Sequence, residues 1–160
     1  MLAGEIEEDV VRVASEKSST IVSHSFSTRA MRKKDIAQVA AWQHAEWPWT
    51  GLKEREHKLL SHLDESRPLP ATLICEEVDG TLLGSAALVA SDMETRNHLT
   101  PWLASVVVRP ASRGQGIGSV LVRDVMQMAA VQGWESIYLV TPDAEQFYAR
   151  LGWSIFEQDV

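Results

Sequence analysis

The glycine-rich segment Arg113-Gly114-Gln115-Gly116-Ile117-Gly118 constrains the fold most, because it joins an apolar strand to an amphipathic helix. The strand is the run Leu103 to Val108, which is short, apolar and rich in β-branched residues. Helical spacing of apolar residues then continues up to Gly133. In a strand, glycine loop and helix of this order, the glycines let the backbone approach a ligand and the first helical amides favour an anion. The sequence therefore predicts a phosphate or pyrophosphate site.

Two common phosphate motifs fit this loop poorly. A Walker loop ends in Gly-Lys-Ser/Thr, whereas Gly118 is followed directly by Ser119. A dinucleotide fingerprint would place its third glycine or alanine at Ser119, and no acidic residue closes the next apolar run, Ile137 to Val140. The loop therefore favours neither a P-loop nucleotide site nor a dinucleotide site.

Arg113, Gly116 and Gly118 do fill another pattern, which is Arg or Gln, two residues, Gly, one residue, then Gly or Ala. This is the coenzyme A pyrophosphate loop of the GCN5-related N-acetyltransferase (GNAT) family, which the segment resembles. The resemblance extends over 102–153, in the family's order of strand, loop, helix, strand, short helix with Phe-Tyr, and Gly-aromatic step. Those pieces are Val106 to Val108, the helix from Gly116 to Gln132, Ile137 to Val140, and Phe147-Tyr148-Ala149-Arg150-Leu151-Gly152-Trp153.

The resemblance implies an α/β (α+β) GNAT fold, with a mixed, mostly antiparallel sheet, helices on both faces and splayed central strands. We expect 1–19 to be an N-terminal extension, with a short helix over Glu5 to Lys17, and 20–160 to be the acetyltransferase domain. Before the loop, the sequence predicts a strand from Thr20 to Thr28. Two helices follow: one begins at Lys34 and is stopped by Trp47-Pro48-Trp49, and the other runs from Leu52 to Leu63. Two strands, Ala71 to Val78 and Thr81 to Ala90, are then joined by a turn at Asp79-Gly80.

The end of the chain departs from the family. Trp153 to Phe156 predicts a strand, and family members usually continue into a last strand that pairs with it, but this sequence ends at Val160. The last strand is therefore missing after this point. We expect the N-terminal extension or a partner chain to fill its place, or else an open edge that could pair with other chains. A homodimer that completes the sheet is one of these expectations.

Composition narrows the class of protein. The 160 residues are 45% hydrophobic, which suits one domain with a full core. A net charge of -7 without a Lys/Arg cluster argues against nucleic acid as a partner and suits basic substrates. One cysteine, Cys75, allows no internal disulfide, and no apolar run is long enough for a membrane span or signal peptide. We expect a cytoplasmic protein with no membrane partner and, because the histidines lack ligand spacing, no metal.

The resemblance implies an N-acetyltransferase that moves the acetyl group of acetyl-CoA to a primary amine, of a small molecule or a peptide, by direct attack in a ternary complex. The pantetheine arm would lie between the strands at Val106 to Val108 and Ile137 to Val140, with a main-chain amide, foremost that of Val107, polarising the thioester carbonyl. The implied cofactor-binding residues are Val106, Val107, Val108, Arg113, Gly114, Gln115, Gly116, Ile117, Gly118, Ser119 and Phe147.

Tyr148 matches the family tyrosine that protonates the departing thiolate. A phenol with a pKa near about 10 can donate to a thiolate whose conjugate acid lies near about 8.5 when the two are well positioned. From its residue type alone, Tyr148 is expected to pack the short helix onto the sheet, as Phe147 is, and the catalytic role is what the resemblance implies. Retention of Tyr148 favours an enzyme over the alternative, a non-catalytic acyl-CoA-binding sensor or assembly module of the same fold.

The general base is less well determined, because the strand before the loop carries no titratable group. The candidates are a water relayed through the backbone and Ser105, and the side chains of Asp92, His98, Glu46 and Glu76. A weak base would favour acceptor amines of low pKa, since more of such an amine is neutral at pH 7.

The resemblance also implies that the loop between the first two helices and the start of the fourth strand border the acceptor cleft, and three tryptophans lie there. Trp47, Trp49 and Trp102 could present their faces to an ammonium group, or they could simply pack in the core. The sequence leaves both interpretations open.

Overall fold

The computed structural model describes residues 1–5 and 25–158 of the chain. Most of the helix predicted over Glu5 to Lys17, and residues 20–24 of the first predicted strand, lie outside these residues. The division into an extension of 1–19 and a domain of 20–160 therefore stays a proposal.

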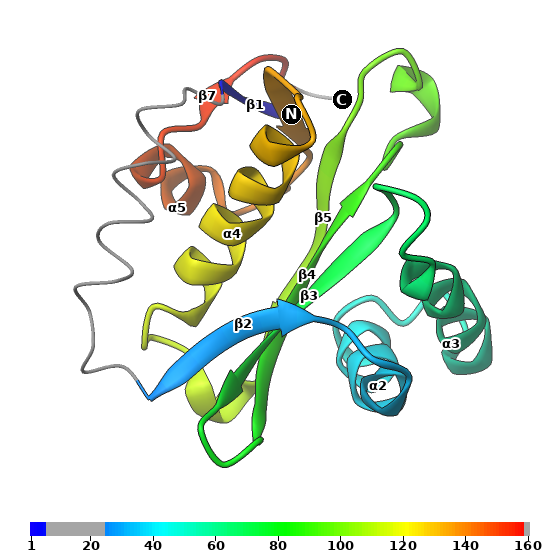
Figure 1. The fold of residues 1–160 in the computed structure, drawn as a ribbon. Helices are drawn as coiled ribbons and strands as arrows, with labels where there is room; N and C mark the ends of the chain where they lie inside the picture. Colours follow the sequence, from blue (N-terminus) through cyan, green and yellow to red (C-terminus); the bar gives the residue numbers. More distant parts are fainter. Residues whose placement is uncertain (6–24, 159–160) are drawn as a thin grey trace.

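The described residues form one open sheet (Figure 1). Its order is β2-β3-β4-β5-β6-β1-β7, and every neighbouring pair is antiparallel except β5 and β6. The strands are β1 (Leu2–Glu5), β2 (Phe26–Ala30), β3 (Ala71–Glu77), β4 (Leu82–Val89), β5 (Trp102–Val108), β6 (Ser136–Leu139) and β7 (Ser154–Ile155). The mixed, mostly antiparallel sheet of the predicted fold class is confirmed, as is the turn at Asp79-Gly80 between β3 and β4.

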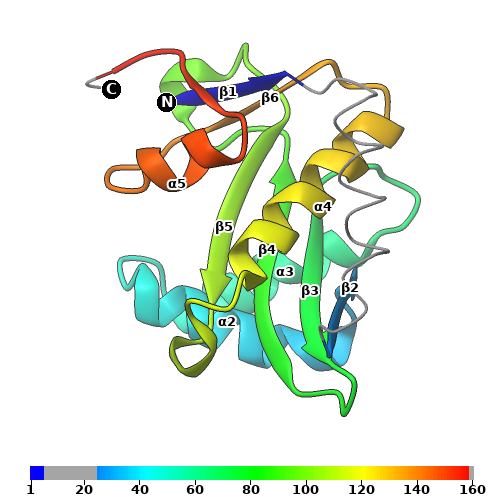
Figure 2. The same ribbon diagram turned by 90° about the vertical axis from the view of Figure 1, so that its left-hand side faces the viewer.

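Helices cover both faces of this sheet (Figure 2). They are α2 (Ile36–Glu46), α3 (Leu52–Leu60), α4 (Ile117–Val131) and α5 (Glu145–Arg150), with single 3₁₀ turns at Lys33–Asp35 and Ser61–Leu63 extending α2 and α3. One core lies under α4 and α5 and includes Leu88, Leu121 and Ile137. A second, smaller core lies under α2 and α3 and includes Val39, Leu59 and Ile74. Each helix that was predicted within the described residues is thus present, and its apolar face packs into one of these cores.

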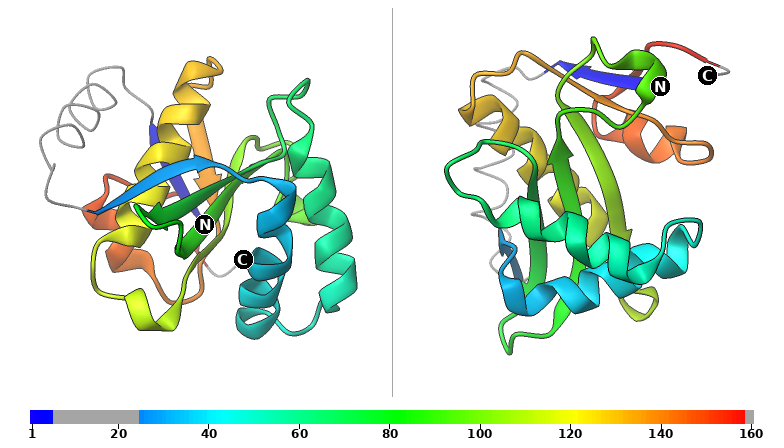
Figure 3. Two further views of the ribbon diagram at one scale, coloured as in Figure 1. Left: turned by 60° about the horizontal axis from the view of Figure 1, so that its bottom comes forward. Right: turned by 90° about the vertical axis from the view of Figure 1, so that its right-hand side faces the viewer.

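The expected gap between β6 and β7 is occupied by β1. Figure 3 shows β1, in blue, beside β6, in orange, and the register pairs Leu2 with Leu139 on β6 and with Ile155 on β7. A Cβ at Gly4 would lie 3.3 Å from both Ile137 and Trp153, so this strand can approach them closely because it has glycine there. Residues from the predicted extension therefore fill the gap within the chain. The sequence did not predict β1, because four residues with a glycine and an acidic end lack a strand pattern.

The β5 and β6 strands separate soon after they meet. The two strands are paired at Trp102 and Tyr138, and the N–H of Tyr138 donates to the Pro101 oxygen at 3.0 Å. Beyond this point the two strands diverge, as Figure 2 shows, and the predicted splay of the central strands is confirmed. The carboxyl half of β5 is left without a strand on that side.

Candidate functional site

The predicted anion loop leads directly into α4. Gly114 and Gly116 have φ of 80° and 84°, values that side chains with a Cβ rarely adopt. Gly116 is the N-cap residue of α4 and has no side chain that could bond the first helical amides. The N–H of Val120 donates to the backbone oxygen of Gly116 at 3.1 Å. The amides that precede Val120 are therefore free of helical bonds and available to an anion.

A cleft of about 590 Å³ lies between this loop, the end of β5 and the start of α5. It contains every predicted cofactor-binding residue except Gln115, whose side chain is exposed outside it. Its lining residues are Glu46, Val106, Val107, Val108, Ser112, Arg113, Gly114, Gly116, Ile117, Gly118, Ser119, Ala144, Phe147 and Tyr148. Ile117 is only 1% exposed, so it belongs to the core and offers the cleft mainly its backbone.

Arg113 stands at the open side of this cleft. Its Nε donates to the Val108 oxygen at 3.2 Å, and its Nη2 lies 3.7 Å from the Glu46 carboxylate. The Arg113 side chain is 57% exposed, and an exposed ion pair of this length contributes little stability. The guanidinium is thus available to an incoming phosphate.

A bulge in β5 determines which amides face the cleft. Ser85 of β4 is opposite Val107, but Ala87 is opposite Ala104, so the intervening Ser105 and Val106 extend past one residue of β4. Ser105 has a φ of 54°, an uncommon value for serine. Successive amides of a strand point to opposite sides. The Arg109 N–H donates to the Leu83 oxygen, so the amide of Val107, two residues earlier, also points toward β4. The amides of Val106 and Val108 are then directed away from β4, toward the side where β6 has diverged.

Tyr148 is almost completely enclosed, with 8% of its surface exposed. Its ring meets those of Phe147 and Trp153 edge-on, at centroid distances of 4.9 and 5.9 Å. Burial raises the pKa of Tyr148 to about 12, and the Asp143 carboxylate adds to this rise by repelling the phenolate. The phenol therefore keeps its proton near neutral pH, which suits a proton donor rather than a base.

A second cleft, of about 790 Å³, lies on the other side of Tyr148. Four residues line both clefts: Glu46, Val106, Ala144 and Tyr148. The others that line the second cleft are Trp47, Trp49, Thr50, Arg55, Asp92, Leu103, Ala104, Ser105, Leu139, Val140, Thr141, Pro142 and Asp143. A molecule in each cleft would therefore meet the other beside Tyr148 and the bulge of β5.

The structure separates the candidates for the base. Ser105, Asp92 and Glu46 line the second cleft, whereas His98 and Glu76 line neither cleft. The Glu76 carboxylate instead lies 3.0 Å from Nε of Arg29. Although Asp92 as a whole residue is exposed at the rim, protein around its carboxyl group displaces water and raises its pKa to about 6.

Of the three candidate tryptophans, two line the second cleft and one does not. Trp47 and Trp49 line the second cleft, and Trp49 is 78% exposed. Trp102 is fully buried, with its Nε1 donating to the Leu99 oxygen at 2.7 Å, so it packs in the core. Sequence reasoning missed Arg55 and Asp143 in this cleft, because neither belongs to a motif of readable spacing.

Within 1–5 and 25–158, no three His, Cys, Asp or Glu side chains are grouped so that they could hold a metal ion. No helix in this part of the chain is both long and apolar enough to cross a membrane.

Comparison with known proteins gave consistent matches. The family model described as acetyltransferase (GNAT) family matches residues 36–153. Glucosamine 6-phosphate N-acetyltransferase of Trypanosoma brucei brucei is 26% identical over 122 residues, which cover 64% of this chain and 83% of that protein.

Solved structures match the fold at lower identity. The crystal structure of glucosamine-6-phosphate N-acetyltransferase from Arabidopsis thaliana superposes with a TM-score of 0.67 at 16% identity, covering 86% of this chain and 97% of that one. A predicted acetyltransferase with acetyl-CoA from Clostridium acetobutylicum also has a TM-score of 0.67, at 18% identity and coverage of 84% and 94%.

Proposed function

Because the chain belongs to the acetyltransferase (GNAT) family, we propose that it moves the acetyl group of acetyl-CoA to a primary amine of a small molecule or a peptide. The observation that carries this proposal is the junction of the two clefts at Tyr148 and Val106. One cleft has the features of a cofactor site, and the other is lined by polar side chains that suit an amine.

The first cleft fits the cofactor in charge and shape. The free amides from Gly116 to Ser119 and the guanidinium of Arg113 would hold the pyrophosphate. A Cβ at Gly118 would lie 3.5 Å from the ring of Phe147, an ordinary contact distance, so a small residue fits between the loop and this ring. Acetyl-CoA supplies a thioester, and the valines at the end of β5 would hold its arm through their main chain.

The transfer step needs three groups from the protein. The acceptor ammonium first loses one proton to the solvent, and its neutral nitrogen then forms a bond to the thioester carbonyl carbon as the carbon–sulfur bond breaks. The amide of Val106, rather than that of Val107, donates to the carbonyl oxygen, because the strand register favours this orientation. Tyr148 gives its proton to the departing sulfur, and the surplus proton of the acceptor nitrogen passes to a base.

We assign the base to Asp92, with Glu46 as the second candidate. With a pKa of about 6, Asp92 is roughly nine-tenths ionised at pH 7 and is a better proton acceptor than an ordinary aspartate. It is still weak compared with an alkyl amine, which favours acceptors of low pKa. Trp47 and Trp49 would receive the ammonium form of the acceptor as it enters.

The wider setting of the activity is also proposed. The single cysteine suits a reducing compartment, and on that basis we assign the protein to the cytoplasm. A homodimer remains a separate hypothesis, since β1 already occupies the gap that a partner strand would have filled. Sedimentation would test it.

The proposal is tested first by thermal unfolding with acetyl-CoA, and with NAD and ATP as controls. A ligand that binds only the folded state raises the midpoint by mass action. We expect a rise with acetyl-CoA alone, followed by thiol release when amines are added. No rise, or an equal rise with NAD, would refute the assignment of the first cleft.

A further inference from the structure

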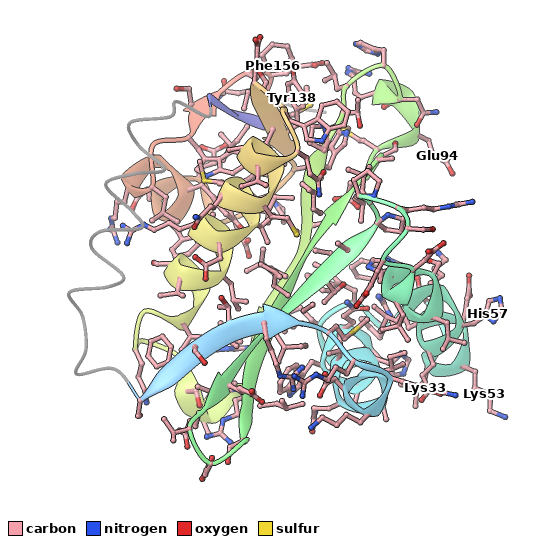
Figure 4. The ribbon with its side chains drawn as sticks, in the orientation of Figure 1. Lys33, Lys53, His57, Glu94, Tyr138 and Phe156 are labelled. Atoms are coloured by element: carbon pink, nitrogen blue, oxygen red, sulfur yellow. The ribbon has the colours of Figure 1, made fainter. Side chains whose placement is uncertain are left out.

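Arg55 is the cationic side chain that lines the second cleft within the described residues. It lies in the first turns of α3, beside the loop that carries Trp47 and Trp49. Its neighbours Lys53 and His57 on the same helix project outward into solvent (Figure 4). Arg55 is only partly exposed, so its guanidinium is held against the protein at the cleft.

No carboxylate among the described residues lies within ion-pair distance of the Arg55 guanidinium. Its Nη2 donates to the Trp47 oxygen, and its Nε is buried with no hydrogen-bond partner among the described residues. No described carboxylate forms an ion pair with it, although Glu46, Asp92 and Asp143 line the same cleft. Burial lowers the pKa of Arg55 from its usual value, and the neighbouring Glu54 carboxylate offsets this only in part.

Two other partly buried arginines among the described residues are ion-paired, whereas a third, Arg109, donates its Nε to the Ser112 hydroxyl. Arg29 lies 2.7 Å from Asp35 and 3.0 Å from Glu76, and Arg96 lies 2.5 Å from Glu157. A desolvated cation without a counter-ion is costly, so a protein keeps one where something else supplies the charge. One backbone carbonyl also occupies only one of the five donors of a guanidinium.

We propose that Arg55 binds an anionic group on the acceptor, a carboxylate or a phosphate, so that the acceptor is an amine that also carries a negative charge. The inference rests on the proposed function and specifies its acceptor. The carboxylates Asp92 and Glu46 lie in the same cleft and suit the amine end of such a molecule. Arg55 would then fix which amine is presented to the thioester, which makes it a specificity-determining residue.

The experiment compares matched acceptors with and without the anion. One pair is D-glucosamine 6-phosphate and D-glucosamine, and the other is 4-aminobutyrate and 4-aminobutyramide. Wild type, Arg55→Gln, Arg55→Lys and the control Lys53→Gln are compared for kcat and KM by thiol release. The Kd of each amine is also measured calorimetrically in the presence of CoA.

We expect wild type and Lys53→Gln to prefer the anionic member of one pair, which identifies phosphate or carboxylate as the source of the charge. Arg55→Gln should reduce that preference by about 10- to 100-fold through KM and Kd, the range for a charge-assisted hydrogen bond, and Arg55→Lys should restore part of it. Loss of activity toward both members alike would overturn the proposal, because it would mean that Arg55 only holds the loop at Trp47.

Binding separates this proposal from the proposed function. If no amine is acetylated but Arg55-dependent binding of an anionic amine remains, acetyl transfer is refuted and the acceptor class stands. If wild type binds neither anionic amine more tightly than its neutral counterpart, the proposal about Arg55 is overturned whether or not transfer occurs.

Discussion

The two clefts that meet at Tyr148 are built in different ways. The first is formed largely by one stretch of chain, the end of β5 and the glycine loop that opens α4, whose proposed ligands are main-chain groups. The second is made of side chains from separate parts of the chain, including Trp47, Arg55, Asp92 and Asp143. A site built from backbone depends on φ values and local order, whereas a site built from side chains depends on which distant segments the fold brings together.

This difference predicts different effects of mutation. A change in the first cleft should alter cofactor binding through backbone geometry and should be independent of the acceptor. A change in the second should alter the acceptor KM or the pH profile and leave cofactor binding unchanged. Tyr148 belongs to both clefts and should therefore show the largest effect of all on the chemical step.

Tyr148→Phe removes the proposed proton donor with little change in shape. We expect kcat to fall by about 100-fold or more, the usual contribution of general acid catalysis, with the Kd for acetyl-CoA unchanged. Tyr138→Phe is the matched control, because Tyr138 packs beside Phe156 at a centroid distance of 5.9 Å, and Figure 4 labels both at the same end of the molecule. Equal activity in the two variants would exclude Tyr148 as the donor.

Asp92→Asn tests the second cleft through its pH dependence. A base must be deprotonated to act, so wild-type kcat/KM should be lost as pH falls through about 6, the pKa of Asp92. In the variant this limb should disappear and activity at neutral pH should fall by about 10-fold or more. Glu94→Gln, at an exposed neighbouring position, should keep the wild-type profile. A limb that persists in Asp92→Asn would transfer the role to Glu46.

Gly116→Ala tests the backbone of the first cleft. A side chain at a φ of 84° is strained even though no atom lies within 4 Å of the new Cβ, and we expect about 1 kcal/mol of lost stability by chemical denaturation. Gly51→Ala is a matched control, because Gly51 has a φ of -64° and equally open space. If both variants were equally stable, the left-handed loop would not be required.

Trp49→Ala should have the smallest effect, since Trp49 is 78% exposed. Loss of a cation–π contact at an exposed site should raise the acceptor KM by about two- to five-fold. Acetyl-CoA binding should be unchanged. A weaker affinity for acetyl-CoA instead would mean that the two clefts are not independent at this loop.

The same contrast explains what the sequence could predict. The first cleft could be predicted almost residue by residue, because a glycine loop between a strand and a helix is local and its ligands are main-chain groups. Gln115 was included by its place in the loop, but its side chain faces solvent outside the cleft. Local order does not determine which way each residue of a loop points.

The second cleft could be predicted only in part. Trp47, Trp49 and Asp92 were candidates because of their position relative to the expected helices and strands. Arg55 and Asp143 were not, since neither belongs to a pattern and the two come to line one cleft only when the chain folds α3 and the segment after β6 around it. The bulge at Ser105 also left no signal, because positive φ at a non-glycine residue is imposed by tertiary structure.

The position of β1 has a consequence for how the molecule folds. Leu2 pairs with Leu139 and with Ile155, so this strand closes a loop of roughly 130 residues or more, whose entropy cost exceeds that of the β3–β4 hairpin. Such distant pairing is expected to form after the local contacts have formed. Because Leu139 and Val140 at the end of β6 also line the second cleft, the acceptor side would be completed late, on a part of the sheet built from both ends of the described chain.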